Sequence, residues 1–325
     1  MERLREWEAD NLDVKVMHDL SPQQIKNGFT NGIDGFFLGT YWWVGKKWAY
    51  NFVRDIALKG GLKKAFGIPQ SAIYIHGSDR ILEDEKKTFI RPYLVALREA
   101  VCFNPDVIQV MDLPLDDRDD DNRVCEKLAI NRDMVEDYHG WLVKNGFRSS
   151  NCYKDGLPKF SKFMLLGVCH GDYCDAYAEE AKFMMKKCEV LGVPVAGLLT
   201  HIKGLSKKQR YDYMFQVLTK VLDVIGNSRV LQLMGFGLSD IMEIPRLVKL
   251  AQKYDATVWI ESSTLVRNSI HARKVLSFNI KNPNVVEYVN VAKVKGAEGF
   301  SPLDIFRQND KVLKGLLTQT QLLSR

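Results

Sequence analysis

Eight short apolar runs, each followed by a longer amphipathic stretch, predict an α/β protein built as a (β/α)8 TIM barrel. The runs are rich in β-branched and large apolar residues and end at small or polar ones, as parallel strands do. No compositional break divides the 325 residues, of which 46% are hydrophobic and 26% charged, enough for one large core. We therefore expect a single-domain barrel over residues 1–275, with residues 276–325 as a short C-terminal appendage packed on it.

The predicted strands follow one another at intervals that leave room for a helix between most of them. Each is short enough for a strand buried on both faces, which reads as a nearly continuous apolar run. The eight strands are expected at residues 13–17, 35–38, 72–75, 107–111, 163–168, 193–199, 230–234 and 257–260.

Helices are predicted between these strands from capping signals and from the spacing of apolar residues. Ser21 before Pro22 is typical of an N-cap followed by proline in the first turn, ahead of a helix over 23–28. The stretches 175–191 and 207–225 each place apolar residues on one face, which predicts that they pack on the sheet. Beyond residue 274, the pattern indicates a strand at 285–291 and a helix at 302–323.

Charge and cysteine content narrow the class of partner. A formal net charge of +6 and a pI near 8.8 favour a polyanionic partner such as nucleic acid.

The six cysteines lack the spacing of a disulfide framework or of a structural zinc site, so we expect reduced thiols and no metal. No glycine-rich nucleotide-binding motif is present, so no cofactor is expected. Without a signal peptide or an apolar run of membrane-spanning length, a cytoplasmic protein with no membrane partner is predicted.

Residues just after the predicted strands are the candidates for function, because active sites of such barrels lie at the carboxyl ends of the strands. Carboxylate and imidazole groups dominate this set. Gathered at one mouth, they suit a pocket for a flat polar heterocycle, where one carboxylate binds the base edge and another attacks or protonates at the sugar–base bond. Each carboxylate also has a structural alternative, which is to cap the next helix or to pair with an arginine. The set comprises His76, Asp79, Asp112, His170, Gly197, Leu198, Met234 and Glu261.

Seven segments in the same order resemble the tRNA-guanine transglycosylase superfamily, over roughly residues 32 to 270. The similarity includes strand ends, a glycine-lined wall and the segment that carries the family's nucleophile. The segments are GIDGFFLGTYWW (32–43), GGLKKAFGIPQSAIYIHGSD (60–79), DVIQVMD (106–112), LLGVCHG (165–171), VAGLL (195–199), LMGFG (233–237) and WIESSTLVRN (259–268).

The resemblance implies an enzyme that exchanges guanine in a nucleic acid for a free 7-deazaguanine base through a covalent glycosyl-enzyme intermediate. By the same resemblance, Glu261 is the nucleophile, and either His76 or Asp79 is the general acid or base. Asp112 is the residue that reads the hydrogen-bonding edge of the purine. The remaining base-binding positions are His170, Gly197, Leu198 and Met234.

The chain departs from the family pattern in ways that bear on its substrate. Glu261 stands where the family usually has Asp, and His170 stands where it has Gln. The Cys-x-Cys-x2-Cys plus His zinc site of the tRNA enzymes is missing. The missing zinc site favours the DNA-directed branch, which inserts bases such as 7-cyano-7-deazaguanine. The same exchange on tRNA and a non-catalytic nucleic-acid-binding subunit are the alternatives.

Two local environments are expected for Glu261. The hydroxyls or amides of Ser262 and Ser263 can hold its carboxylate in the ionised form that a nucleophile requires. Alternatively, Glu261 pairs with Arg267 or caps the following helix, and its role is then structural.

Overall fold

The computed structural model describes residues 14–38, 47–48, 51, 54–55, 65–68, 92–116, 118–150, 158–200, 204–237, 241, 243–278, 286–297 and 299–323. Within these residues, eight parallel strands pair in sequence order, and the first strand pairs with the eighth as well as the second. The mixed α/β class predicted from the sequence is thus confirmed, with a curled parallel sheet of the TIM-like kind. The strands are β1 (Val14–Asp19), β2 (Gly35–Phe37), β3 (Ala65–Ile68), β4 (Val107–Gln109), β5 (Met164–Val168), β6 (Val190–Val193), β7 (Val230–Leu233) and β8 (Val258–Ser262).

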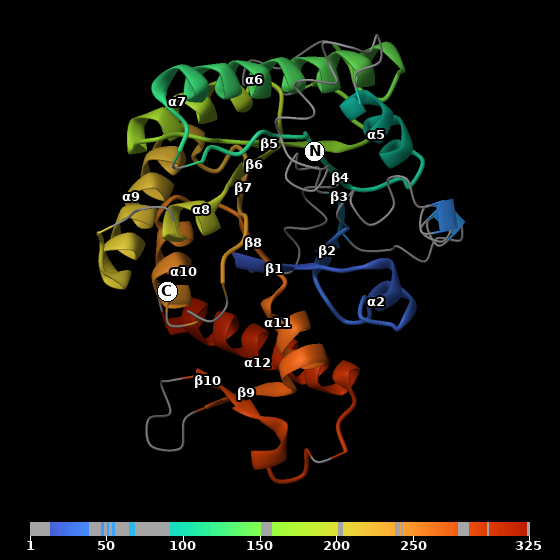
Figure 1. The fold of residues 1–325 in the computed structure, drawn as a ribbon, viewed down its shortest axis with the longest axis vertical. Helices are drawn as coiled ribbons and strands as arrows, with labels where there is room; N and C mark the ends of the chain where they lie inside the picture. Colours follow the sequence, from blue (N-terminus) through green and yellow to red (C-terminus); the bar gives the residue numbers. More distant parts are fainter. Residues whose placement is uncertain are drawn as a thin grey trace.

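Helices surround this sheet. In the view of Figure 1, α6 lies along the top, α7, α9 and α10 lie along the left side, and α12 lies below the strands. From β3 to β8 at least one helix separates each strand from the next, and most of the connection from β2 to β3 lies outside the described residues. In the parts of the chain that are described, no helix has both the length and the apolar character needed to cross a bilayer. The helices are α2 (Pro22–Lys26), α5 (Pro92–Val101), α6 (Asp121–Lys144), α7 (Cys174–Met184), α8 (Val195–Thr200), α9 (Lys207–Ile225), α10 (Ile244–Lys253), α11 (Thr264–Arg267), a π-helical turn (Asn268–Ala272) and α12 (Pro302–Leu323).

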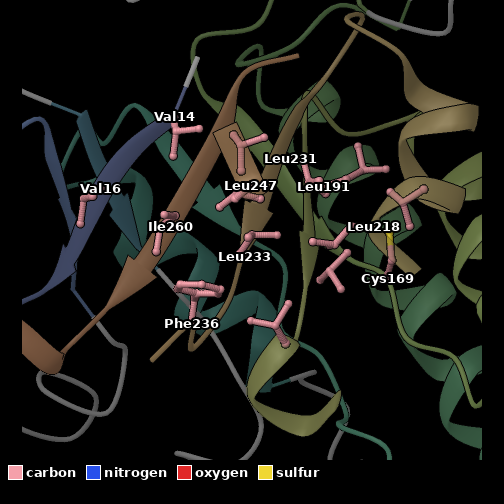
Figure 2. Packing of buried hydrophobic residues seen from close by; sticks show 14 of the residues in the cluster. Val14, Val16, Cys169, Leu191, Leu218, Leu231, Leu233, Phe236, Leu247 and Ile260 are labelled. Carbon is pink, nitrogen blue, oxygen red and sulfur yellow. The ribbon is translucent and has the colours of Figure 1, made fainter. Parts of the chain in front are cut away.

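Alternation along the strands divides the buried apolar residues into two clusters. On β8, Val258 and Ile260 belong to the outer core between sheet and helices, while Trp259 points to the other face. Figure 2 shows part of the outer core, with strand residues such as Leu231 and Leu233 among side chains that include Leu218 and Leu247 of the helices. The second cluster, here called the inner core, lies on the face enclosed by the strands. It consists of Met17, Phe37, Val107, Met164, Leu166, Val168, Val190, Val230 and Trp259.

Several local predictions are confirmed. Ser21 caps α2 by accepting a hydrogen bond from the backbone N–H of Gln24, whose side chain accepts one from the backbone N–H of Ser21. The helix predicted at 207–225 is α9, and the helix predicted at 302–323 is α12. The strand predicted at 285–291 is β10 (Val286–Asn290), which pairs antiparallel with β9 (Lys274–Phe278).

Two strand predictions were misplaced. The third strand is β3, earlier in the chain than the predicted run at 72–75, which lies outside the described residues. The sixth strand, predicted at 193–199, is β6, and residues 195–200 form α8 instead. Short apolar runs do not distinguish a strand from a buried helix, and Pro194 ends the pairing because it has no N–H to donate. The helix predicted at 175–191 is α7, which ends at Met184, and the apolar residues Val190 and Leu191 belong to β6 instead.

The C-terminal helix α12 is packed into the layer that surrounds the strands. Its Phe306, which is fully buried, contacts the rings of His18 on β1 and Phe29, with centroids 4.9 and 5.0 Å away. Nε2 of His18 lies 3.0 Å from the carboxylate of Asp310 on the same helix. The domain boundary expected at residue 275 falls within β9, and α12 contacts β1 through His18.

Candidate active site

Four polar side chains lie on the inner face of the sheet near the carboxyl ends of their strands. Each stands two residues after a member of the inner core, so the two-residue period of a strand directs it to the same face. Because parallel strands share one carboxyl end, the four residues meet at one mouth. They are Asp19 on β1, Gln109 on β4, Gln232 on β7 and Glu261 on β8.

Asp112 and His170 form a buried pair at this mouth, as the strand-end argument predicted for their position. Nε2 of His170 lies 2.9 Å from Oδ2 of Asp112, and their exposed fractions are 3% and 6%. Gln109 donates a hydrogen bond from Nε2 to the other carboxylate oxygen, over 3.3 Å. Asn131 holds the segment after β4 in place: its Oδ1 accepts a hydrogen bond from the backbone N–H of Leu113 over 2.7 Å, and its Nδ2 donates one to the carbonyl of Leu113 over 3.0 Å. The Asp112 carboxylate is therefore fixed in orientation before any ligand arrives.

Glu261 is held by β7. Gln232, which is fully buried, donates a hydrogen bond from Nε2 to Oε2 of Glu261 over 3.0 Å. The pKa of Glu261 is raised from 4.5 to about 8, mainly by burial and also by the charges of Asp19 and Asp112, while the Gln232 hydrogen bond lowers it. The side chain is nevertheless partly accessible, as expected for a group that lines a pocket.

The expected surroundings of Glu261 were wrong in one respect. Oγ of Ser262 accepts a hydrogen bond from the backbone N–H of Thr264. The hydrogen bond to the Glu261 carboxyl group comes from Gln232 on the neighbouring strand instead. The raised pKa means that Glu261 is mainly protonated at neutral pH, contrary to the expectation of an ionised group. In this state it donates a hydrogen bond, and it becomes a nucleophile only after losing the proton.

Asp19 is a member of the site that sequence reasoning missed. It is the last residue of β1, and burial raises its pKa from 3.8 to about 6. Its Oδ1 is buried and has no hydrogen-bond partner among the residues that the structure describes. The signal was present in the sequence, since Asp19 stands two residues after the first apolar run, as Asp112 follows the fourth.

The mouth also presents unpaired hydrogen-bond acceptors. Within the described parts of the chain, Oε1 of Gln109 and Oε1 of Gln232 have no partner, and both residues are fully buried. An unpaired buried acceptor costs about 1 to 3 kcal/mol, so such groups call for a donor from outside the chain. With Asp19 Oδ1, these atoms make the interior of the mouth rich in unpaired acceptors.

Met234 packs at the mouth against a glycine of β6. A methyl group on Gly192 would stand 2.8 Å from Sδ of Met234, so this close contact depends on the absence of a side chain. The backbone N–H groups of Met234 and Ala196 bind Val193 O and Met234 O, respectively, at 2.9 and 3.3 Å. These bonds join the end of β7 to the end of β6 and to the start of α8, and Met234 packs against the inner core.

The other predicted site residues lie in α8 or outside the described residues. Gly197 and Leu198 lie in α8, and Leu198 is buried in the outer core. His76 and Asp79 lie outside the described residues, so the general acid or base assigned to them is a prediction only. Five cysteines are described and all are free, and burial raises the pKa of Cys169 and Cys188. No group of three or more His, Cys, Asp or Glu within the described ranges is arranged to hold a metal ion.

Comparison with known proteins adds no assignment. No protein-family model matches the chain, and the search of curated proteins finds no match either. The geometry of the mouth and the sequence resemblance therefore carry the functional argument.

Proposed function

We propose that this protein is a single-domain (β/α)8-barrel enzyme that exchanges guanine in DNA for a 7-deazaguanine base, such as 7-cyano-7-deazaguanine. The observation that carries the proposal is the juxtaposition, at one end of a parallel sheet, of two supported carboxyl groups. Gln232 binds Glu261, while His170 and Gln109 bind Asp112. This arrangement suits one group that reacts at the sugar and another that holds the base, which are the two roles that the family resemblance assigns to these positions.

Base recognition follows from the donor and acceptor pattern of the site. The N1–H and exocyclic amine of guanine form a paired donor edge, and an ionised carboxylate only accepts. Each oxygen of Asp112 already takes part in one contact but has a further lone pair for the base. The unpaired amide oxygen of Gln109, beside Asp112, is a third acceptor within the same cluster.

The exchange itself requires a covalent intermediate. Attack of the Glu261 carboxylate on C1′ forms an ester and releases guanine, and the incoming base then displaces the carboxylate, so the energy of the glycosidic bond is retained. A base within a duplex has to be flipped out of the stack first, at a cost of a few kcal/mol. The net charge of +6 favours phosphate contacts that offset this cost.

One observation favours a second candidate, a nucleic-acid-binding subunit without turnover. With a pKa of about 8, Glu261 is ionised in only roughly a tenth of the molecules at pH 7. A binding protein needs no ionised nucleophile, and a protonated Glu261 can still donate a hydrogen bond to a base.

Labelled 7-cyano-7-deazaguanine, incubated with the protein and either DNA or tRNA, separates these candidates. We expect incorporation into DNA and, in reactions stopped midway, a covalent adduct between Glu261 and DNA detected by mass spectrometry. Glu261→Gln should abolish incorporation while changing DNA affinity less than about twofold, because it keeps the shape and removes the nucleophile. Glu136→Gln is the matched control, since Glu136 stands at an exposed position of α6 and forms an ion pair with Lys187.

Three results would count against the proposal. Incorporation into tRNA alone would move the substrate to RNA. No incorporation into either nucleic acid would favour the binding subunit. Exchange by the Glu261→Gln protein at an appreciable rate would place the nucleophile elsewhere.

A further inference from the structure

We propose that Asp19 is a second catalytic carboxyl group of this site, which gives a proton to the departing base and recovers it from the incoming base. The inference rests on the proposed base exchange and names a residue for proton transfer within the described part of the mouth. It assigns to Asp19 a role that the sequence resemblance gives to His76 or Asp79.

The pairing of β1 with β8 sets the two carboxyl groups side by side. Met17 on β1 is in register with Glu261 on β8, and Asp19 follows Met17 by two residues on the same face. Neighbouring strands lie about 4.8 Å apart and the chain rises about 3.3 Å per residue, so the two Cα atoms are separated by about 8 Å. Side chains of Asp and Glu together span such a distance. Asp19 stands on the mouth side of Glu261, where a base must enter and leave.

Unpaired polar atoms around the two carboxyl groups point to a ligand between them. Oδ1 of Asp19 is buried without a partner among the described residues, and so is Oε1 of Gln232, the residue that binds Glu261. Gln232 is fully buried, so solvent does not satisfy that oxygen. A nucleobase, whose ring and exocyclic nitrogens carry hydrogens, supplies the missing donors.

The proton is conserved over the two half-reactions. In the first, the Glu261 carboxylate bonds to C1′, the bond from C1′ to N9 breaks, and protonated Asp19 gives its proton to the departing guanine. In the second, Asp19 takes the N9 proton of the incoming base, N9 bonds to C1′ and the Glu261 ester bond breaks. The site ends as it began, with one proton shared by the two carboxyl groups and no oxidant or cofactor consumed.

The charges around the pair are compatible with one shared proton. Among the described residues, the other titratable groups on this face or rim are Lys15 on β1, Asp112 after β4 and His170 after β5. Burial raises the pKa of Asp19 to about 6 and that of Glu261 to about 8, and the negative charge of Asp19 contributes to the latter. Between these two pH values the pair holds one proton, which lies mainly on Glu261. The reactive arrangement, with the proton on Asp19 and Glu261 ionised, is therefore the minor form, and a bound base has to favour it.

A change of departing base tests the role of Asp19 directly. Guanine needs a proton to leave, whereas 7-methylguanine already carries a positive charge in DNA and departs without one. We expect Asp19→Asn to slow exchange at guanine by roughly 100- to 1000-fold, the usual effect of losing a general acid, and departure of 7-methylguanine by less than about tenfold. Glu261→Gln should abolish both reactions. Asp223→Asn, which changes an exposed carboxylate that accepts the Tyr254 hydroxyl on the outer surface, is the matched control.

The outcomes separate this inference from the proposed function. An equal loss with both departing bases would overturn it and make Asp19 a positioning residue, and an unimpaired Asp19→Asn would overturn it outright. No exchange by the wild-type protein would overturn the proposed function instead. If Asp19→Asn does not fold, Asp19→Ser with added formate replaces it. Formate should then restore exchange at guanine by at least tenfold, and failure to do so while 7-methylguanine still departs would count against the inference.

Discussion

Replacing Glu261 by Gln should stabilise the folded protein, and the gain should grow as the pH rises from 5 to 8. The physical reason is the pKa of the folded state, which burial and neighbouring carboxylates raise from 4.5 to about 8. Over this pH range the folded protein binds more protons at this position than the unfolded chain does, so stability is lost as the pH rises. Gln keeps the Gln232 neighbour and the shape of the side chain but does not ionise, so it escapes this loss.

The size of the effect follows from the same pKa. Ionising such a carboxyl group at pH 8 costs at most roughly 5 kcal/mol relative to the unfolded chain. Because the side chain is partly accessible, screening by solvent reduces this to about 1 to 3 kcal/mol, or roughly 1 to 5 °C in Tm for a chain of this length. Thermal unfolding of wild type, Glu261→Gln and the exposed control Glu136→Gln at pH 5 to 9 measures it. The reasoning is refuted if the difference between Glu261→Gln and wild type is independent of pH or shrinks toward pH 8.

Two further predictions concern the base pocket and the C-terminal helix. Asp112→Asn should weaken binding of free 7-cyano-7-deazaguanine by about 2 to 3 kcal/mol in calorimetry. The substitution replaces one carboxylate oxygen beside His170 by an amide NH2 group, which cannot accept a hydrogen bond from the N1–H or the exocyclic amine of the base. Unchanged affinity would show that Asp112 does not bind the base. Phe306→Ala should cost about 3 to 5 kcal/mol in urea-induced unfolding, because the ring is fully buried against His18 and Phe29. If α12 were a separate appendage, the main unfolding transition would instead stay where it is.

The strand-end argument located much of the candidate site. Asp112 and His170 were selected because each follows an apolar run, and the structure brings them into contact although 58 positions separate them. Glu261 was selected in the same way and lies on the inner face of β8. The alternation of strands and helices shows where each strand ends in the sequence. Because the carboxyl ends of parallel strands lie at one edge of the sheet, residues at these ends can be predicted to lie together without knowing their contacts.

The inner-face residues were harder to find from the sequence. Gln109 and Gln232 lie within apolar runs, and strands buried on both faces give no alternation that reveals which side chains point inward. Asp19 was missed because the first strand extends two residues beyond the predicted run at 13–17. The displaced third strand has a larger effect, since the acid or base was sought after residue 75 while β3 ends at Ile68.

The protonation of Glu261 depends on residues from several strands, which explains why its neighbours in sequence gave the wrong answer. Asp19, Gln232 and Asp112 belong to segments far apart along the chain, and all three act on this pKa. A bound base changes the balance again, because its N–H groups stabilise the carboxylates they contact in the ionised form. If a base binds as proposed, its affinity and the ionisation of the site are linked, and each must shift the other by the same free energy. The empty site then favours a protonated, unreactive Glu261, and the arrival of the substrate favours the nucleophile.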